Sequence, residues 1–252
     1  MPYFDYAGKK IYFNTYGSRG DFLLLLHAGA MSSRMFLKEI SRFYGKYFKV
    51  YTFDYPGLGK SSKAGPIPDN YWIEAAHVAI ALSKRLGVDS TFVIGTDAGA
   101  VAALNMAIMA PELVKKAVCD GFLGVNIDPA LADLIKDSRE ASKKGAMAAA
   151  WFLIHGFGWK KRVDADTEKI MKSRGEAALI PGGLKDIKCP VAFTAGNPDP
   201  AIPDTEKTLM TYTEMNSLFC YKLMSKPGHM SMLNDNYSFS RFAKEFFGRS
   251  PV

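Results

Sequence analysis

Three side chains that together could carry out nucleophilic catalysis each follow an apolar segment of the chain. Asp97 lies in the run GTDAGA, residues 95–100, between a β-rich segment and an alanine-rich helical pattern. Asp199 and His229 each follow a later apolar segment. In the order carboxylate, acid and histidine, such residues can act as nucleophile, orienting acid and base. The fold must therefore bring three distant segments to one place.

Segments with strand patterns alternate with helical patterns along most of the chain. A short continuous apolar run such as residues 21–26 is typical of a strand buried on both faces, and the alternating segment 9–17 predicts an edge strand. This alternation predicts an α/β fold, with a mostly parallel central sheet and helices on both faces. The other predicted strands are 48–57, 90–95, 113–122, 189–197 and 217–225, and the predicted helices are 32–46, 70–87, 98–110, 204–215 and 238–247.

The alternation stops between residues 125 and 181, where helical periodicity continues without an obvious strand. We expect a core domain of residues 1–124 and 182–252, and a helical cap of residues 125–181. An insertion at this point would lie above the carboxyl ends of the strands, where open α/β sheets bind ligands.

The cap holds Trp151, His155 and Trp159, spaced by four residues. On one helix they would share a face and could line a substrate pocket. An indole or imidazole N–H could then bind a departing halide. The alternative is that this stripe packs the cap against the sheet, and Gly156 and Gly158 interrupt the helical pattern.

The motifs, taken together in their order, resemble the α/β-hydrolase fold with a small helical cap. They are the His-x-Gly turn at His27, the run DYPGLGKS, the Gly-x-Asp-x-Gly elbow, GNPDPAIP and PGHMSM. The resemblance implies that Asp97 holds the nucleophile position, Asp199 the orienting acid and His229 the base.

The same resemblance places an oxyanion hole at the amides of Gly29 and Ala98. Gly95 and Gly99 would permit the crowded backbone of the elbow. Asp120 is a second candidate for the orienting acid, because some dehalogenases place theirs after this strand. The non-catalytic alternative for the elbow aspartate is an N-cap on the following helix.

An aspartate at the elbow changes the chemistry of this fold. A carboxylate is ionised at neutral pH and can displace a leaving group from an sp³ carbon, which forms a covalent alkyl ester. His229 would then activate water against that ester. Alkyl halides and epoxides suit this route, whereas attack on a carboxylic ester would form an anhydride. We expect a cofactor-free hydrolase of a small, mainly apolar substrate.

Two other hypotheses remain open. Haloalkane dehalogenases and epoxide hydrolases usually carry His-Asp-Trp at the elbow, and fluoroacetate dehalogenases His-Asp-Arg, whereas this chain has Thr96-Asp97-Ala98. The segment 125–181 also lacks the cap tyrosines of epoxide hydrolases. The surroundings resemble small serine carboxylesterases and C–C hydrolases, in which Asp97 would replace the serine, naturally or by engineering. The third hypothesis is a non-catalytic ligand-binding protein.

Composition restricts the partners. The net charge is +7, but the basic residues are scattered among 25 acids, so we expect a small-molecule substrate and neither a nucleic-acid nor a membrane partner. No cluster has metal-ligand spacing. Cys119, Cys189 and Cys220 lie in or beside apolar runs, which predicts reduced core residues and, with no signal or membrane-spanning segment, a cytoplasmic protein.

Overall fold

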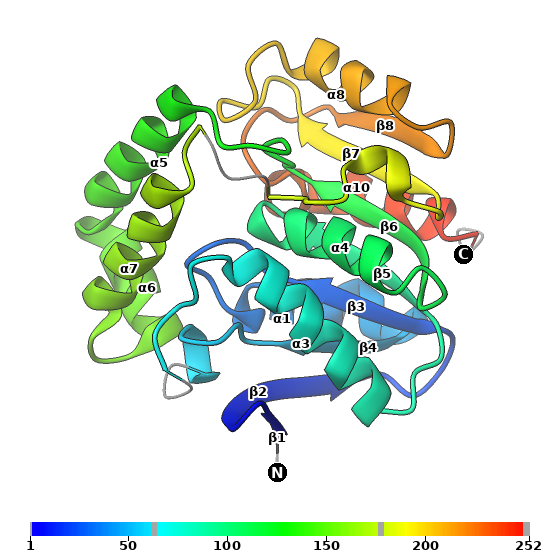
Figure 1. Ribbon diagram of the computed structural model, residues 1–252, viewed down its shortest axis with the longest axis horizontal. Helices are drawn as coiled ribbons and strands as arrows, with labels where there is room; N and C mark the ends of the chain where they lie inside the picture. The colour runs from blue at the N-terminus through cyan, green and yellow to red at the C-terminus, as the bar shows by residue number, and fades with distance from the viewer. Residues whose placement is uncertain (1, 62–64, 176–178, 249–252) are drawn as a thin grey trace.

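The computed structural model describes residues 2–61, 65–175 and 179–248, and its centre is an eight-stranded sheet (Figure 1). The spatial order is β1-β2-β4-β3-β5-β6-β7-β8. The β1–β2 and β2–β4 pairs are antiparallel and the other neighbours are parallel. The predicted α/β class is confirmed. The strands are β1 (Tyr3–Tyr6), β2 (Lys9–Tyr16), β3 (Phe22–Leu26), β4 (Lys49–Phe53), β5 (Thr91–Thr96), β6 (Val114–Asp120), β7 (Val191–Gly196) and β8 (Phe219–Met224).

Helices cover both faces of the sheet (Figure 1). The α-helices are α1 (Leu37–Glu39), α2 (Gly45–Tyr47), α3 (Tyr71–Arg85), α4 (Ala98–Met109), α5 (Pro129–Ser142), α6 (Gly145–His155), α7 (Trp159–Lys172), α8 (Thr205–Glu214), α9 (Ser231–Asn234) and α10 (Asn236–Phe246). Single turns of 3₁₀-helix lie at Ser33–Phe36, Gly59–Ser61 and Leu184–Asp186, and a π-helix at Ile40–Tyr44.

The continuous apolar run of β3 serves two separate cores. Successive strand side chains point to opposite faces. Leu24 and Leu26 therefore pack in the core beneath α3 and α4, whereas Leu23 and Leu25 pack in the core beneath α10 and the 33–47 segment. A strand with two buried faces cannot show the polar alternation of a half-exposed strand, which explains its sequence.

The structure corrects three details of the sequence-based prediction. The segment 9–17 is not the edge of the sheet, because β1 pairs outside it; β1 has four residues, of which only Phe4 is buried, too few to show a pattern. The expected helix 32–46 is a succession of short 3₁₀, α and π segments. Cys119 and Cys189 are buried free thiols, but Cys220 on β8 is exposed and not a core residue.

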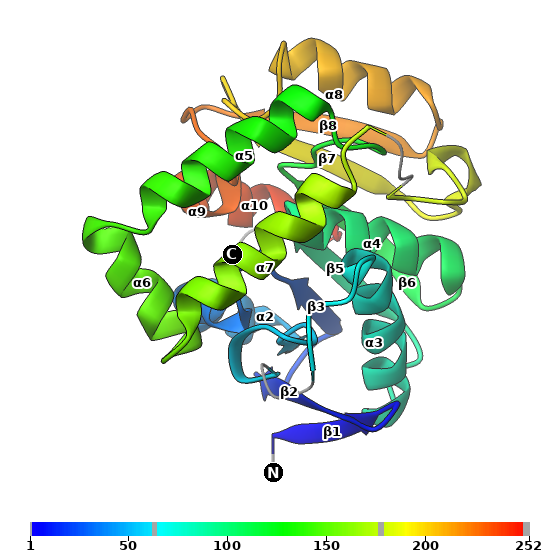
Figure 2. The same cartoon turned by 60° about the vertical axis from the view of Figure 1, so that its left-hand side comes forward.

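Three helices separate β6 from β7. The helices α5, α6 and α7 contact one another and stand at one side of the sheet (Figure 2). Within residues 125–181, of which 176–178 lie outside the described residues, the only β-type pairing described is an isolated bridge between Ile127 and Arg174. The boundaries of the cap stay a prediction. No helix in the described ranges has the length and apolar character needed to cross a bilayer.

Two glycines allow α4 to start against the sheet. A Cβ atom on Gly99 would lie 2.1 Å from the Leu26 carbonyl oxygen, and one on Gly95 would lie 2.1 Å from the Gly99 carbonyl oxygen. Such distances are far shorter than any van der Waals contact, so a larger residue must move the backbone. The position of the elbow therefore depends on these two residues.

We predict that Gly99→Ala lowers the free energy of unfolding by more than about 3 kcal/mol, because overpacking against rigid backbone forces a shift of the helix. Gly87→Ala is the matched control: its Cβ would meet no heavy atom within 4 Å, although its φ is +67°. That change should cost only about 1 kcal/mol. Urea denaturation measures both, and equal losses would contradict the clash.

Candidate active site

Asp97 lies at a strained elbow between β5 and α4. Its φ of +53° and ψ of −117° are unusual for a residue with a side chain. The Asp97 amide donates to the Asp120 carbonyl at 2.8 Å, which anchors the turn to the end of β6. Asp97 holds the N-cap position of α4, as the alternative predicted, but its side chain makes no capping hydrogen bond to the helix. The elbow instead directs the carboxylate toward Gly29, in the turn after β3, and toward His229, in the loop after β8.

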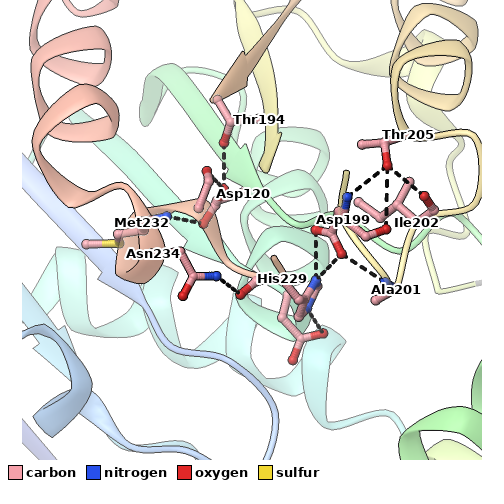
Figure 3. Close-up of polar contacts among 11 residues, drawn as sticks. Asp120, Thr194, Asp199, Ala201, Ile202, Thr205, His229, Met232 and Asn234 are labelled. Carbon is pink, nitrogen blue, oxygen red and sulfur yellow. Dashed lines mark hydrogen bonds and ion pairs between the residues drawn. The ribbon is translucent and has the colours of Figure 1, made fainter. Parts of the chain in front are cut away.

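The structure brings Asp97, Asp199 and His229 together. The His229 Nδ1 atom lies 3.0 Å from Asp199 Oδ2 and 3.2 Å from Oδ1, as Figure 3 shows. On the other side of the ring, Nε2 lies 3.9 Å from Asp97 Oδ1, beyond hydrogen-bonding distance. Asp199 is 3% exposed and also accepts from the Ala201 amide at 2.9 Å. The histidine is thus oriented by one carboxylate and faces the other.

The second oxygen of Asp97 occupies the predicted oxyanion hole. The Gly29 amide, in the turn after β3, donates to Asp97 Oδ2 at 3.0 Å. Ala98 is the first residue of α4 and lines the same cavity, where the amides of a helix N-terminus lack intrahelical acceptors. The two carboxylate oxygens therefore have different surroundings: Oδ2 is held by an amide, and Oδ1 faces His229.

Asp120, the second candidate for the orienting acid, has other partners. Its Oδ1 accepts from Thr194 Oγ1 at 2.9 Å and from the Ser231 hydroxyl, and its Oδ2 accepts from the Met232 amide at 2.9 Å (Figure 3). Burial raises the pKa of this carboxyl, against these donors. Asp120 thus fixes α9, which follows the histidine loop, to β6 and β7, and Asp199 is the acid bonded to the imidazole.

The charges around His229 hold it protonated. Burial opposes a charged imidazole, but the hydrogen bond that His229 donates to Asp199 and the nearby Asp97 carboxylate together raise the pKa of His229 to about 10. Burial alone would likewise raise the pKa of Asp97, but His229, Arg139 and the Gly29 amide outweigh it and hold that pKa below its usual range. The resting site at neutral pH is a carboxylate beside an imidazolium.

A cavity of about 520 Å³ opens above these residues. Most of its lining is apolar and comes both from segments around the sheet and from α5, α6 and α7. Besides Asp97 and His229, its polar side chains are those of Tyr71, Ser138, Arg139 and Ser142. A pocket of this size accommodates a drug-sized organic molecule. Within the described ranges, no group of three or more His, Cys, Asp or Glu side chains is arranged to hold a metal ion.

The three aromatic cap residues do not share one helix face. Trp151 lines the cavity, but its indole N–H donates to Ser142 Oγ at 2.9 Å. His155 ends α6, and its ring bonds to backbone groups of the core. Trp159 begins α7 after a break at Gly156, where φ is +69°, and packs beside Val163. Neither the Trp151 nor the His155 N–H is free to bind a halide.

Three polar residues near the site were not predicted from the sequence. Tyr71 and Arg139 line the cavity, and Asp166 is fully buried beside Arg139, with an Nη1–Oδ2 distance of 3.2 Å. A signal for Asp166 exists: it lies on the buried stripe of α7 with Val163, Thr167 and Ile170, at helical spacing. A carboxylate on an apolar stripe requires a partner.

We predict that the His229 ring titrates with a midpoint near pH 10 in NMR spectra. Because the folded-state pKa lies above the usual 6.5, protonation stabilises the fold most below pH 6.5, and this contribution is lost as the pH rises to about 10. In Asp97→Asn, which keeps the shape and removes one charge, the midpoint should fall by about 1–3 pH units. An unchanged midpoint would contradict the electrostatic description of the site.

Comparisons with known proteins agree with this architecture. A family model described as alpha/beta hydrolase fold matches residues 21–141. The solved structure of MGS-M2, an α/β-hydrolase enzyme from a deep-sea metagenome library of the Medee basin, is 21% identical, covers 99% of this chain and 98% of its own, and superposes with a TM-score of 0.75. The enol-lactonase from Burkholderia xenovorans is 18% identical over 98% of this chain and 100% of its own, with a TM-score of 0.75.

Part of the chain also matches another hydrolase in sequence. The zearalenone hydrolase of Cladophialophora bantiana is 32% identical over 110 residues, which are 43% of this chain and 41% of that protein. The match therefore spans about two fifths of the relative's length. Together with the sheet order, these comparisons show that the chain has the α/β-hydrolase fold.

Proposed function

We propose that the protein is a hydrolase that uses Asp97 as the nucleophile and passes through a covalent alkyl-enzyme ester. One observation carries this proposal: Asp97 Oδ2 already accepts from the Gly29 amide, whereas Oδ1 faces the cavity and His229. With Oδ2 in the oxyanion hole, the carbonyl oxygen of a substrate ester has no place there. A displacement at an sp³ carbon needs no such place, because the charge moves from Oδ1 to the leaving group.

In the first step, Oδ1 forms a bond to the substrate carbon while the bond from that carbon to the leaving group breaks. A halide departs as the anion, and an epoxide oxygen departs as an alkoxide that takes a proton. The Tyr71 hydroxyl and the Arg139 guanidinium are donors on the cavity wall, and both approach Gly29 on the side of Asp97. Burial raises the pKa of Tyr71 well above its usual value, so the phenol remains a proton donor.

In the second step, water attacks the Asp97 carboxyl carbon. Esterification removes the Asp97 charge that helps to raise the pKa of His229, so the imidazolium gives up its proton more easily. The proton goes to the alkoxide of an opened epoxide or, after loss of a halide, to solvent, and the neutral imidazole can then act as base. The Gly29 amide stabilises the oxyanion that forms on Oδ2, an interaction worth about 3–4 kcal/mol in comparable sites. Collapse of this intermediate releases the alcohol, which takes the proton from His229, and leaves Asp97 as the carboxylic acid. The acid proton then passes to the neutral His229, which restores the carboxylate beside the imidazolium.

We expect His229→Ala to trap the alkyl ester, because its formation needs only Asp97 whereas its hydrolysis needs the imidazole. Intact-mass spectrometry of the variant, incubated with a panel of haloalkanes and epoxides, should show one adduct per chain. For a haloalkane, the added mass is that of the compound minus the hydrogen halide, and an epoxide adds its whole mass. Peptide mapping should place the adduct on Asp97.

The control is Asp97→Ala in the same His229→Ala background, which should form no adduct. Wild-type protein should turn over every compound that labels the variant. If a broad panel leaves the His229→Ala variant unmodified, the displacement mechanism is wrong. Ligands that raise the melting temperature without any adduct or turnover would instead favour a binding protein.

A second candidate function is ester or C–C hydrolysis on a scaffold in which Asp97 replaces a serine. The likeness to an enol-lactonase and to a zearalenone hydrolase favours it. The rest of a serine mechanism is present in the geometry: an acid-bound histidine and an amide donor beside the elbow. In this case the aspartate would block the oxyanion hole and abolish acyl transfer.

For this candidate we predict that Asp97→Ser hydrolyses p-nitrophenyl acetate at least about tenfold faster than wild type, because a serine leaves the Gly29 amide free for the substrate oxygen. The double variant Asp97→Ser with His229→Ala should lose the gain. No increase above wild type would argue against the serine-hydrolase lineage.

A further inference from the structure

Gly29 and Ala30 form the turn after β3, here called the oxyanion turn. All four backbone polar groups of these two residues are hydrogen-bonded to side chains. The Gly29 amide donates to Asp97, and the Gly29 carbonyl accepts from Arg139 Nη2 at 3.1 Å. The Ala30 amide donates to Asp166 Oδ1 at 2.9 Å, and the Ala30 carbonyl lies 2.7 Å from His155 Nε2. Neither residue belongs to a strand or helix, so these side chains take the place of a regular backbone ladder.

Three of these four partners come from the three different helices between β6 and β7. Arg139 lies on α5, His155 ends α6 and Asp166 lies on α7. Their side chains are largely withdrawn from solvent: Arg139 is 13% exposed and Asp166 is 0%. Each helix therefore contributes one buried contact to the same two residues of the core.

The His155 ring has a defined tautomer in this arrangement. Its Nδ1 accepts from the Gly59 amide at 3.1 Å, so the proton lies on Nε2 and is donated to the Ala30 carbonyl. Burial lowers the pKa of this imidazole to about 4, which keeps it neutral. His155 thus connects the turn after β3 with the turn after β4.

The oxyanion turn needs such external support. Ala30 has a φ of +53°, in the left-handed region that costs a residue with a side chain free energy. Without the three cap side chains, three buried backbone groups of residues 29 and 30 would lose their partners, which is unfavourable. The contact between the helices and the core therefore holds the two peptide units that directly follow the one carrying the Gly29 amide.

We propose that Arg139, His155 and Asp166 are positioning residues that hold the Gly29 amide against Asp97, so that the oxyanion hole is complete only while the cap contacts the core. The catalytic use of this amide rests on the proposed function, whereas the coupling between cap and turn does not. Movement of α5, α6 and α7 that admits substrate would then also disassemble the hole.

Amide hydrogen exchange tests the coupling without any substrate. In Arg139→Met and in His155→Phe, the amides of Gly29 and Ala30 should exchange at least about tenfold faster than in wild type. Asp166 can protonate when Arg139 is lost, because burial already raises its pKa, so the variant should still fold. His155→Gln keeps a donor at the position of Nε2 and should restore most of the protection.

The matched control is Lys169→Met. Lys169 on α7 pairs with Asp69 of the core at 2.6 Å, but this pair touches neither Gly29 nor Ala30. Like Arg139→Met, Lys169→Met removes a cation through which one of these helices contacts the core. It should leave the exchange of residues 29 and 30 unchanged. If this control accelerates the exchange as much as Arg139→Met does, the proposal is wrong and the turn responds only to general loosening.

The catalytic consequence has its own readout. Compounds that label the His229→Ala variant should alkylate His155→Phe at nearly the wild-type rate, but hydrolysis of the ester should slow at least tenfold, so that adduct accumulates during turnover. A loss confined to alkylation would contradict the positioning role. If no compound labels any form of the protein, the proposed function fails, and the exchange measurement still decides the coupling.

Discussion

The hydrogen bond between the Gly29 amide and Asp97 Oδ2 is the interaction on which this site depends. It assigns different tasks to the two oxygens of one carboxylate: one is held as the future oxyanion, and the other is left toward the cavity. The positive φ of Asp97 is needed to bring the side chain there, and the glycines beside it let α4 start close to the ends of β3 and β5. A small change at the elbow would therefore change the chemistry that the site supports.

The charge of His229 also depends on the state of Asp97. Two carboxylates flank His229 in the resting protein, and both raise its pKa. Once one of them is esterified, the balance shifts toward the neutral imidazole. The proposed mechanism thus needs no separate switch to convert an acid into a base, because the first chemical step removes the charge that held the proton.

The sequence was sufficient to predict the parallel sheet and the convergence of Asp97, Asp199 and His229, because strand ends and motif order carry that information. It could not predict the partners of residues 29 and 30. Arg139 lies among charged residues that are typical of a solvated helix, and no local pattern reveals it. The apolar stripe around Asp166 indicates that this carboxylate is buried, but both residues reach a turn more than 100 residues away, which no local pattern predicts. His155 was selected for its spacing from two tryptophans, but a helix break at Gly156 separates it from Trp159.

The central claim is that the product's new oxygen comes first from Asp97 and not from water. A single turnover in ¹⁸O-labelled water, with wild-type enzyme in excess over a compound that it hydrolyses, tests this directly. The account predicts an unlabelled alcohol and one ¹⁸O atom in the peptide that contains Asp97. An alcohol that carries ¹⁸O after the first turnover, with an unlabelled peptide, would show direct attack by water and contradict the account.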